Sequence, residues 1–258
     1  MLRRRRRTIL SRAAWVGIEP RGSLEAATTS RGRDLALLVA KPARYAAAVT
    51  RGPHRHFFDL WSLVYDAPGV QRVTYRPVQD AVVRALRADP PERILDVGCG
   101  TGRLGLRLSR ELPRAHVTGC DLSRGMLGRA LARGRALAWV QGDAEHLPFA
   151  DGCFGAVVST EAFHWFPDPE LALAGFHRVL AARGRLLIAF VNPSFEVLSR
   201  ASRVVSRWLG EPLRWPTADV LRRQVETAGF EVLRQRRIFR LPAPVLFPPV
   251  LTEAVRRD

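Results

Sequence analysis

The sequence predicts an α/β fold in which a doubly wound, mostly parallel sheet is covered by helices on both faces. Two observations predict it. Between residues 93 and 191, short apolar strands alternate with helical segments, which is the pattern of strand–helix–strand units. One of these strands, Cys153 to Ser159, is a continuous apolar run, as expected when both faces of a sheet are covered. With 258 residues the chain can bury one substantial core, so we expect one folded domain.

The first strand carries the acid Asp96 near its end and runs into a turn with three alternating glycines, Gly98, Gly100 and Gly102. Glycine lets the backbone turn tightly and lets a ligand lie against the peptide N–H groups at the start of the next helix. A dinucleotide fingerprint would need a third glycine at position 103, which is Arg103. The pattern therefore predicts a nucleotide-type cofactor loop of a different kind.

The second strand, Ala115 to Cys120, ends in Asp121 about twenty residues beyond the glycines. An acid at this position can accept hydrogen bonds from both hydroxyls of a ribose, and Leu122 beside it can pack on an adenine face. The alternative is that Asp121 only caps the helix beginning near Ser123.

A third acid, Asp143, follows the next strand, and a fourth strand ends at Thr160. With these motifs in order, the segment from Ile94 to Val191 resembles the class I S-adenosylmethionine-dependent methyltransferases, in the small-molecule subgroup that includes ubiquinone and menaquinone biosynthesis enzymes.

The resemblance implies a Rossmann-like sheet of seven strands in the order 3-2-1-4-5-7-6, with the last strand antiparallel, and S-adenosylmethionine as cofactor. It also implies that Asp143 accepts from the adenine amino group and that the backbone of Ala144 pairs with the ring. The residues expected at the cofactor are Asp96, Gly98, Gly100, Gly102, Asp121, Leu122, Asp143, Ala144 and Thr160.

The chain divides into a disordered basic tail (1–30) and a methyltransferase domain (31–258). Within the domain we expect a helical cover over the cofactor (31–90), including a helix from Pro77 to Ala88, then the cofactor-binding core (91–191). The region 192–258 holds a substrate-side insertion around Trp208 and the last strands. Further expected elements are a helix from Pro169 to Ala182 with Gly184 in the left-handed position after it, a helix from Thr217 to Ala228, and a strand from Phe230 to Leu233 before a final strand from Arg237 to Leu241.

The net charge is +17, and residues 1–55 carry +10 of it. Because 40 of the 41 basic residues are Arg, composition alone is poor evidence for nucleic-acid binding. Three interpretations of residues 1–30 stay open: a mitochondrial presequence, an arm that contacts an anionic surface weakly, or an inert tail from an upstream start codon.

For the acceptor side, His164 is the candidate base, because it follows the fourth strand at the edge where ligands of doubly wound sheets bind. Tyr65, Tyr75 and Trp165 join it as candidate pocket residues. The alternative is that His164 and Trp165 only pack. Three other histidines, His116, His146 and His177, lack convergent carboxylates in the sequence, so we infer no metal.

The apolar runs are far shorter than the ~20 residues that cross a bilayer, and three cysteines match neither a zinc site nor paired disulfides, which favours a cytoplasmic protein with reduced thiols. The predicted function is metal-free methyl transfer to the oxygen or carbon of a small, apolar organic substrate, with nucleic acid an unlikely partner. The alternatives are a catalytically silent protein that binds nucleic acid or membrane through its arm, and an RNA methyltransferase. Against the latter, Ser159 to Ala162 replaces an Asn-Pro-Pro-Tyr type motif.

Overall fold

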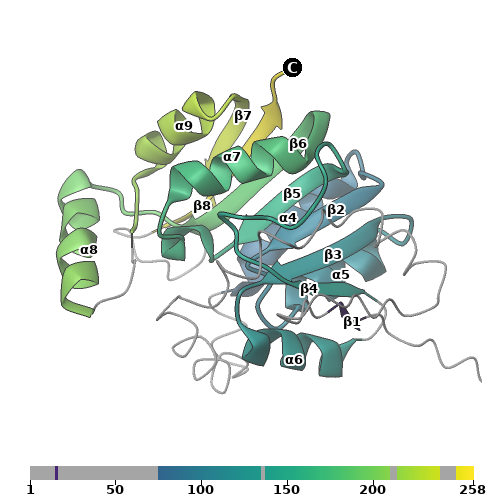
Figure 1. The fold of residues 1–258 in the computed structure, drawn as a ribbon. Coiled ribbons are helices and arrows are strands. Elements are labelled where there is room, and N and C mark those ends of the chain that lie inside the picture. The colour runs from purple at the N-terminus through teal and green to yellow at the C-terminus, as the bar shows by residue number, and fades with distance from the viewer. Residues whose placement is uncertain (1–14, 17–74, 135–136, 210–213, 239–247) are drawn as a thin grey trace, which may run out of the picture.

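A computed structural model describes residues 15–16, 75–134, 137–209, 214–238 and 248–258, and its centre is an eight-stranded sheet between two layers of helices (Figure 1). Along the chain the strands are β1 (Trp15–Val16), β2 (Arg93–Val97), β3 (His116–Asp121), β4 (Ala138–Gln141), β5 (Phe154–Thr160), β6 (Leu180–Val191), β7 (Phe230–Arg237) and β8 (Pro249–Arg256).

The strands lie in the order β1-β4-β3-β2-β5-β6-β8-β7, and β8 is antiparallel to both of its neighbours. Leaving β1 aside, this is the predicted order 3-2-1-4-5-7-6, which is confirmed. The additional strand β1 pairs in parallel with β4, with Trp15 opposite Trp139. Residues 1–30 were expected to be a disordered tail; Trp15 and Val16 form this short strand, and the rest of residues 1–30 lies outside the described residues.

Neighbouring residues of the central strands alternate between two buried layers, because side chains of a strand point to opposite faces. Ile94, Ala156 and Leu187 enter one layer, and Leu95, Val157 and Leu186 enter the other. The first layer is covered by α4 (Arg76–Arg87), α5 (Arg103–Glu111) and α6 (Arg124–Arg133), and the second by α7 (Pro169–Val179) and α9 (Ala218–Thr227). Helix α8 (Glu196–Leu209) stands at the side of the sheet (Figure 1).

Helix α4 packs flat on the sheet, with Val78, Ala81, Val82 and Leu86 all fully buried. The region 31–90 was expected to cover the cofactor, but this last part of it belongs to the core under β5, β6 and β8. Its apolar positions recur at helical spacing on one face, which is what a sheet-packed helix requires. The earlier part, residues 31–74, lies outside the described residues.

The connection from α7 to β6 is shorter than predicted. Helix α7 begins at Pro169, where the Asp168 side chain accepts from two backbone N–H groups, and it ends at Val179 rather than Ala182. Arg183, not Gly184, has the left-handed backbone, with a φ of 56°. Gly184 is needed for a different reason: a Cβ there would lie 2.8 Å from the carbonyl oxygen of Ala181.

The last two strands differ from the prediction as well. The strand expected at Phe230–Leu233 is longer than predicted, because β7 continues to Arg237 with an irregularity between Val232 and Arg234. Of the strand expected at Arg237–Leu241, only Arg237 lies in β7, Ile238 follows it outside the strand, and the final strand is β8. The break in alternation at Leu233, which is 60 % exposed, makes β7 look shorter in the sequence than it is. Residues 239–241 lie outside the described residues.

None of the helices described is both long and apolar enough to cross a membrane.

Candidate functional site

The glycine turn joins β2 to α5 at the carboxyl edge of the sheet. Gly98, Gly100 and Gly102 have φ values of 69°, 53° and 74°, a left-handed region that favours glycine. At Gly98 a side chain is also excluded by space, because a Cβ would lie 2.4 Å from that of Ala162. Helix α5 begins after Gly102, which has no side chain to cap the helix start. This is the arrangement that binds anionic or polar ligand groups at a helix start.

Asp121 ties the end of β3 to the glycine turn. Its Oδ2 accepts from the N–H of Gly100 at 2.8 Å, and its Oδ1 accepts from the N–H of Ser123 at 2.9 Å. The alternative interpretation of Asp121 as a helix cap is only half right, because Ser123 is the N-cap of α6 and accepts from the N–H of Met126 at 3.1 Å. Asp121 is partly exposed at this edge, so its carboxylate lies where a ligand can reach it.

Asp96 lies beneath the glycine turn, and its carboxyl group is buried. The residue is 1 % exposed, and its carboxylate faces the N–H of Gly105 in the first turn of α5, although neither oxygen is placed for a full hydrogen bond within the described residues. Burial, followed by the nearby charge of Asp121, raises the pKa of Asp96 from 3.8 to about 7. A cationic ligand at this edge would stabilise the ionised form of both carboxylates.

The loop after β4 closes the site on the other side of Asp121. The N–H of Gly142 donates to the backbone oxygen of Asp121 at 3.0 Å, and Asp143 accepts from the N–H of Glu145 at 3.0 Å. Ala144 is buried, and Leu122 is partly exposed.

Gln141 organises this edge and was missed by the sequence analysis. Its side chain is 5 % exposed and donates to the carbonyl of Leu122 at 3.0 Å, while its Oε1 accepts from Arg124 at 2.9 Å. The signal in the sequence was a polar residue at the end of an otherwise apolar strand.

The histidine His146 was expected to have no convergent carboxylates, and this is wrong. The turn from Asp143 to His146 brings ligand atoms of Asp143, Glu145 and His146 within 4.8 Å of one another. Both carboxylates accept hydrogen bonds from the nearby backbone. Asp143 accepts from the N–H of Glu145, and Glu145 accepts from the N–H of Asp168 at 2.5 Å. We assign no ion to this cluster, whose His146 is exposed.

At the end of β5, Thr160 is followed by a short 3-10 helix, η3 (Phe163–Trp165), that holds His164. The imidazole is 7 % exposed and lies against Trp165, Phe190 and Trp215, at ring-centre distances of 5.3, 5.5 and 6.2 Å. Burial lowers the pKa of His164 to about 3, so the ring is neutral near pH 7. Its Nδ1 has no hydrogen-bond partner within the described part of the chain.

Residues Arg214 to Pro216 form a strap across this edge. The N–H of Arg214 donates to the carbonyl of His164 at 2.9 Å, and the side chain of Asn192 donates to the carbonyl of Pro216 at 2.8 Å. The N–H of Trp215 donates to Ser202 of α8 at 3.3 Å. The insertion around Trp208 was expected to define the substrate side; the side chain of Trp208 lies outside the described residues, and Trp215 of the strap lines the cavity beside η3.

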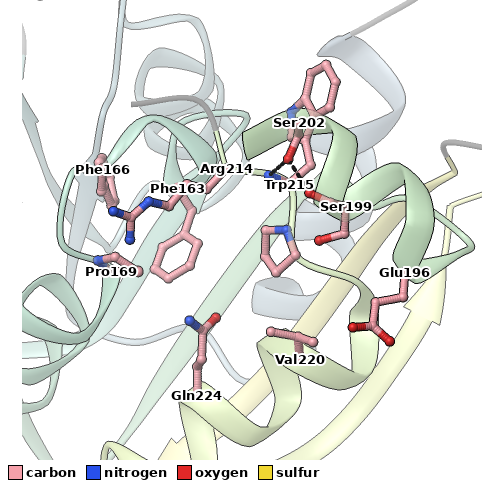
Figure 2. Close-up of a pocket in the computed structure, with 11 residues that line it drawn as sticks. Phe163, Phe166, Pro169, Glu196, Ser199, Ser202, Arg214, Trp215, Val220 and Gln224 are labelled. Atoms are coloured by element: carbon pink, nitrogen blue, oxygen red, sulfur yellow. Dashed lines mark hydrogen bonds between the residues drawn. The ribbon is translucent and has the colours of Figure 1, made fainter. Parts of the chain in front are cut away.

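A cavity of about 390 Å³ lies between η3, α8, α9 and the strap (Figure 2). Its lining combines aromatic and aliphatic side chains with a few polar groups. The lining residues are Phe163, Phe166, Pro169, Glu196, Ser199, Ser202, Arg214, Trp215, Pro216, Val220 and Gln224.

Of the predicted pocket residues that the structure describes, none lines this cavity. His164 and Trp165 lie between Phe163 and Phe166, and it is the two phenylalanines that face the cavity. Tyr75 directly precedes α4, and Tyr65 lies outside the described residues. The sequence analysis missed the phenylalanines, although their position on either side of His164 was a signal. It had no signal for Arg214 or Gln224, which reach the cavity only through tertiary packing.

Comparison with known proteins identifies the central part of the chain. Residues 95–188 match the profile of a methyltransferase domain. The chain is 36 % identical over 197 residues to malonyl-acyl-carrier-protein O-methyltransferase from Geobacter sulfurreducens, which covers 70 % of this chain and 71 % of that relative. It is 36 % identical over 166 residues to demethylmenaquinone methyltransferase from Thermus thermophilus, covering 55 % of this chain and 76 % of that relative.

Solved structures show the same fold. Phosphoethanolamine N-methyltransferase 2 from Haemonchus contortus, in complex with S-adenosyl-L-methionine, aligns with a TM-score of 0.64 at 17 % identity and covers 81 % of this chain and 61 % of that one. The cyclase SpnF aligns with a TM-score of 0.59 at 22 % identity, covering 70 % and 80 %. Because the same fold also carries a cyclase, the activity is argued from the sequence relatives rather than from the fold.

Proposed function

The chain belongs to the S-adenosylmethionine-dependent methyltransferases, and from that premise we propose that it methylates an oxygen or carbon of a small, apolar organic acceptor. The single observation that carries the proposal is that the glycine turn meets the segment that holds the cavity wall: a Cβ on Gly98 would lie 2.4 Å from that of Ala162, which directly precedes η3. The glycine turn and Asp121 lie at the ends of β2 and β3, and a largely apolar cavity lies beyond the end of β5. Ligands of doubly wound sheets bind at this edge.

The residues at the ends of β2, β3 and β4 suit the cofactor chemically. S-adenosylmethionine has a ribose diol, a cationic sulfonium and an amino-acid end. Asp121 would accept hydrogen bonds from the diol, and the uncapped start of α5 would face the amino-acid end. The buried carboxylate of Asp96 would supply negative charge beneath the turn. We assign Gly98, Gly100 and Gly102 to the loop that lets the ligand approach the backbone.

The adenine end of the cofactor is assigned to the loops after β3 and β4. Leu122 is partly exposed beside Asp121 and would contact the ring face. Asp143 would accept from the amino group, and the backbone of Ala144 would pair with the ring edge. Thr160, at the end of β5, would complete the site toward the acceptor.

The bound cofactor supplies an already activated methyl group, so the chain needs mainly to hold the acceptor in line and exclude water. Phe163 and Phe166 form the apolar wall that would do both, with their rings 5.6 Å apart. With a pKa of about 3, His164 is a poor proton acceptor. His164 lies behind the cavity wall, with its Nδ1 buried and without a partner among the described residues. We therefore propose that neutral His164 orients the acceptor through a hydrogen bond at Nδ1, which requires the cavity wall to shift, with Trp165 supporting its ring.

The experiment is a turnover screen with the full-length protein and S-adenosylmethionine, using phenols, quinone precursors and medium-chain fatty acids as acceptors. Formation of S-adenosylhomocysteine and of a product heavier by one methyl group is measured by mass spectrometry. We expect product with at least one apolar class and none with polar amines of similar size. Turnover of the amines alone would contradict the proposal.

A further inference from the structure

The cavity beside η3 has a cation at its rim that no acid of the described residues pairs with. Arg214 lies on the strap, fixed by its backbone bond to His164, and its guanidinium reaches the rim beside Phe166 and Pro169 (Figure 2). None of the ion pairs formed between described residues includes Arg214. A guanidinium binds oxyanions through two parallel hydrogen bonds, which makes this group suited to a ligand carboxylate or phosphate.

The acids nearby are already occupied. Glu196, on the opposite side of the cavity, accepts from Nε and Nη2 of Arg200 at 3.2 and 2.8 Å. Asp168, next to the rim residue Pro169, accepts from the N–H groups of Glu170 and Leu171. The uncompensated charge of the cavity is therefore positive and lies at the Arg214 end.

A second observation independently points to a ligand. Gln224 of α9 directs its amide toward Phe163 (Figure 2), and its Oε1 is buried without a hydrogen-bond partner among the described residues. A buried polar atom without a partner is costly and is commonly satisfied by a bound molecule or water. Between Gln224 and Arg214, the lining is the apolar surface of Phe163, Phe166 and Val220.

We infer that the acceptor is an amphipathic anion, whose oxyanion is bound by Arg214 and whose apolar body lies against Phe163, Phe166 and Val220. This inference rests on the proposed function, since it names the class of acceptor for the same site. Arg214 is then the residue that distinguishes acids from neutral molecules of the same shape. The net charge of +17 would also raise the local concentration of such an anion.

The test compares three probes with one alkyl chain: octanoate, octyl phosphate and octan-1-ol. Their affinities are measured by calorimetry with and without saturating S-adenosylhomocysteine. We expect at least one anion to bind the parent protein tenfold or more tightly than octan-1-ol, the size expected for one charge-assisted hydrogen-bond pair. The stronger of the two anions identifies the oxyanion as carboxylate or phosphate.

Two variants test whether Arg214 causes the preference for the anion over octan-1-ol. Arg214→Gln should weaken the preferred anion at least tenfold and leave octan-1-ol within twofold, while Arg214→Lys should keep part of the preference. The matched control is Arg222→Gln, because Arg222 lies outside the cavity on α9 and pairs with Glu226 at 3.6 Å. The control should bind all three probes like the parent protein.

Equal binding of all three probes by the parent protein would overturn the inference, as would an anion preference that survives Arg214→Gln. A parent protein that does not bind S-adenosylhomocysteine would instead contradict the proposed function, and the probe titrations without this ligand would still decide the role of Arg214. Because the Arg214 side chain is exposed and its strap bond uses the backbone, the Gln variant should keep the parent melting temperature.

Discussion

Asp121 is the residue on which the cofactor site depends most, because it joins two strand ends and faces the ligand. Asp121→Ala should weaken binding of S-adenosylhomocysteine by roughly 1.5 to 3 kcal/mol, the range for hydrogen bonds to a charged group. Calorimetry measures the loss directly. Asp151→Ala is the control, because Asp151 is an exposed carboxylate, paired with Arg178, that lies away from the site. Unchanged affinity in a folded Asp121 variant would remove this residue from the site.

The buried carboxyl of Asp96 predicts a particular dependence of stability on pH. Since the pKa of Asp96 is raised from 3.8 to about 7, the folded state holds this proton more tightly than the unfolded state. Its contribution is complete below pH 3.8 and is lost as the pH rises through 7, by roughly 4 kcal/mol at 1.36 kcal/mol per pKa unit. Asp96→Asn should therefore gain stability relative to the parent protein between pH 4 and 7.5 in urea titrations. Parallel curves for the two proteins would contradict this account.

Substitutions of His164 test the acceptor side of the site. His164→Ala should lower turnover by ~10- to 1000-fold with nearly unchanged affinity for S-adenosylmethionine, as expected for a group that acts on the acceptor. His164→Phe retains the ring contacts with Phe190 and Trp215, so it should lose turnover while keeping the melting temperature. Turnover of either variant within twofold of the parent would leave His164 as a packing residue.

Protonation of His164 changes the stability of the folded protein in the opposite direction from protonation of Asp96. Its pKa is lowered to about 3 from 6.5, so its stabilising contribution is complete above pH 6.5 and is lost as the pH falls toward 3. The His164→Phe protein should lack this acid-side loss.

At the residue level, the sequence predicted those features that depend on neighbouring residues along the chain. Glycines with positive φ and acids at strand ends are visible because their neighbours along the chain set their role. Arg214 and Gln224 could not be predicted, because they reach the cavity from segments that come together only in the folded chain. Burial of Asp96 and His164, and thus their shifted pKa values, also depends on distant contacts.

At the level of elements, the packing of β4 against β3 depends on one aromatic side chain. Trp139 is fully buried, its indole N–H donates to the carbonyl of Gly134 at 3.0 Å, and its ring fills the space beside Gly119 and Gly102. A Cβ on Gly119 would lie 2.4 Å from two ring carbons, and one on Gly102 would lie 2.4 Å from a third. The same tryptophan therefore supports both the strand pair and the glycine turn.

This arrangement predicts contrasting effects of two glycine substitutions. Gly119→Ala should destabilise the protein by about 1 to 3 kcal/mol, because the enclosed ring has to shift. Gly128→Ala, in the middle of α6 with nothing within 4 Å of the new Cβ, should stabilise it by roughly 0.5 to 1 kcal/mol through helix propensity. Chemical denaturation measures both. A neutral Gly119 variant would show that Trp139 is less constrained than its contacts indicate.

The element boundaries show where sequence patterns fail. The strands buried on both faces, such as β5, were predicted within one residue because continuous apolar runs are unambiguous. The edge strand β7 was predicted too short, because its irregularity at Leu233 interrupts the alternation. The strand β1 was missed because two residues in a basic segment carry no periodic signal.

At the scale of the whole molecule, the strand order places the candidate cofactor residues at one edge of the sheet. The parallel strands β2, β3, β4 and β5 all end there, and the strap adds the cavity beyond β5. This order was predicted from the resemblance of the central segment, whereas the arrangement of the acceptor side depends on the region after Val191, where the sequence pattern is weak.

The measurement that tests the central claim most directly is a calorimetric titration of the full-length protein with S-adenosylmethionine at pH 7.5. The site at the ends of β2 and β3 predicts saturable binding of one molecule per chain, lost or strongly weakened in Asp121→Ala and retained in Asp151→Ala. Absence of binding by the folded parent protein, or equal binding by all three proteins, would contradict the account.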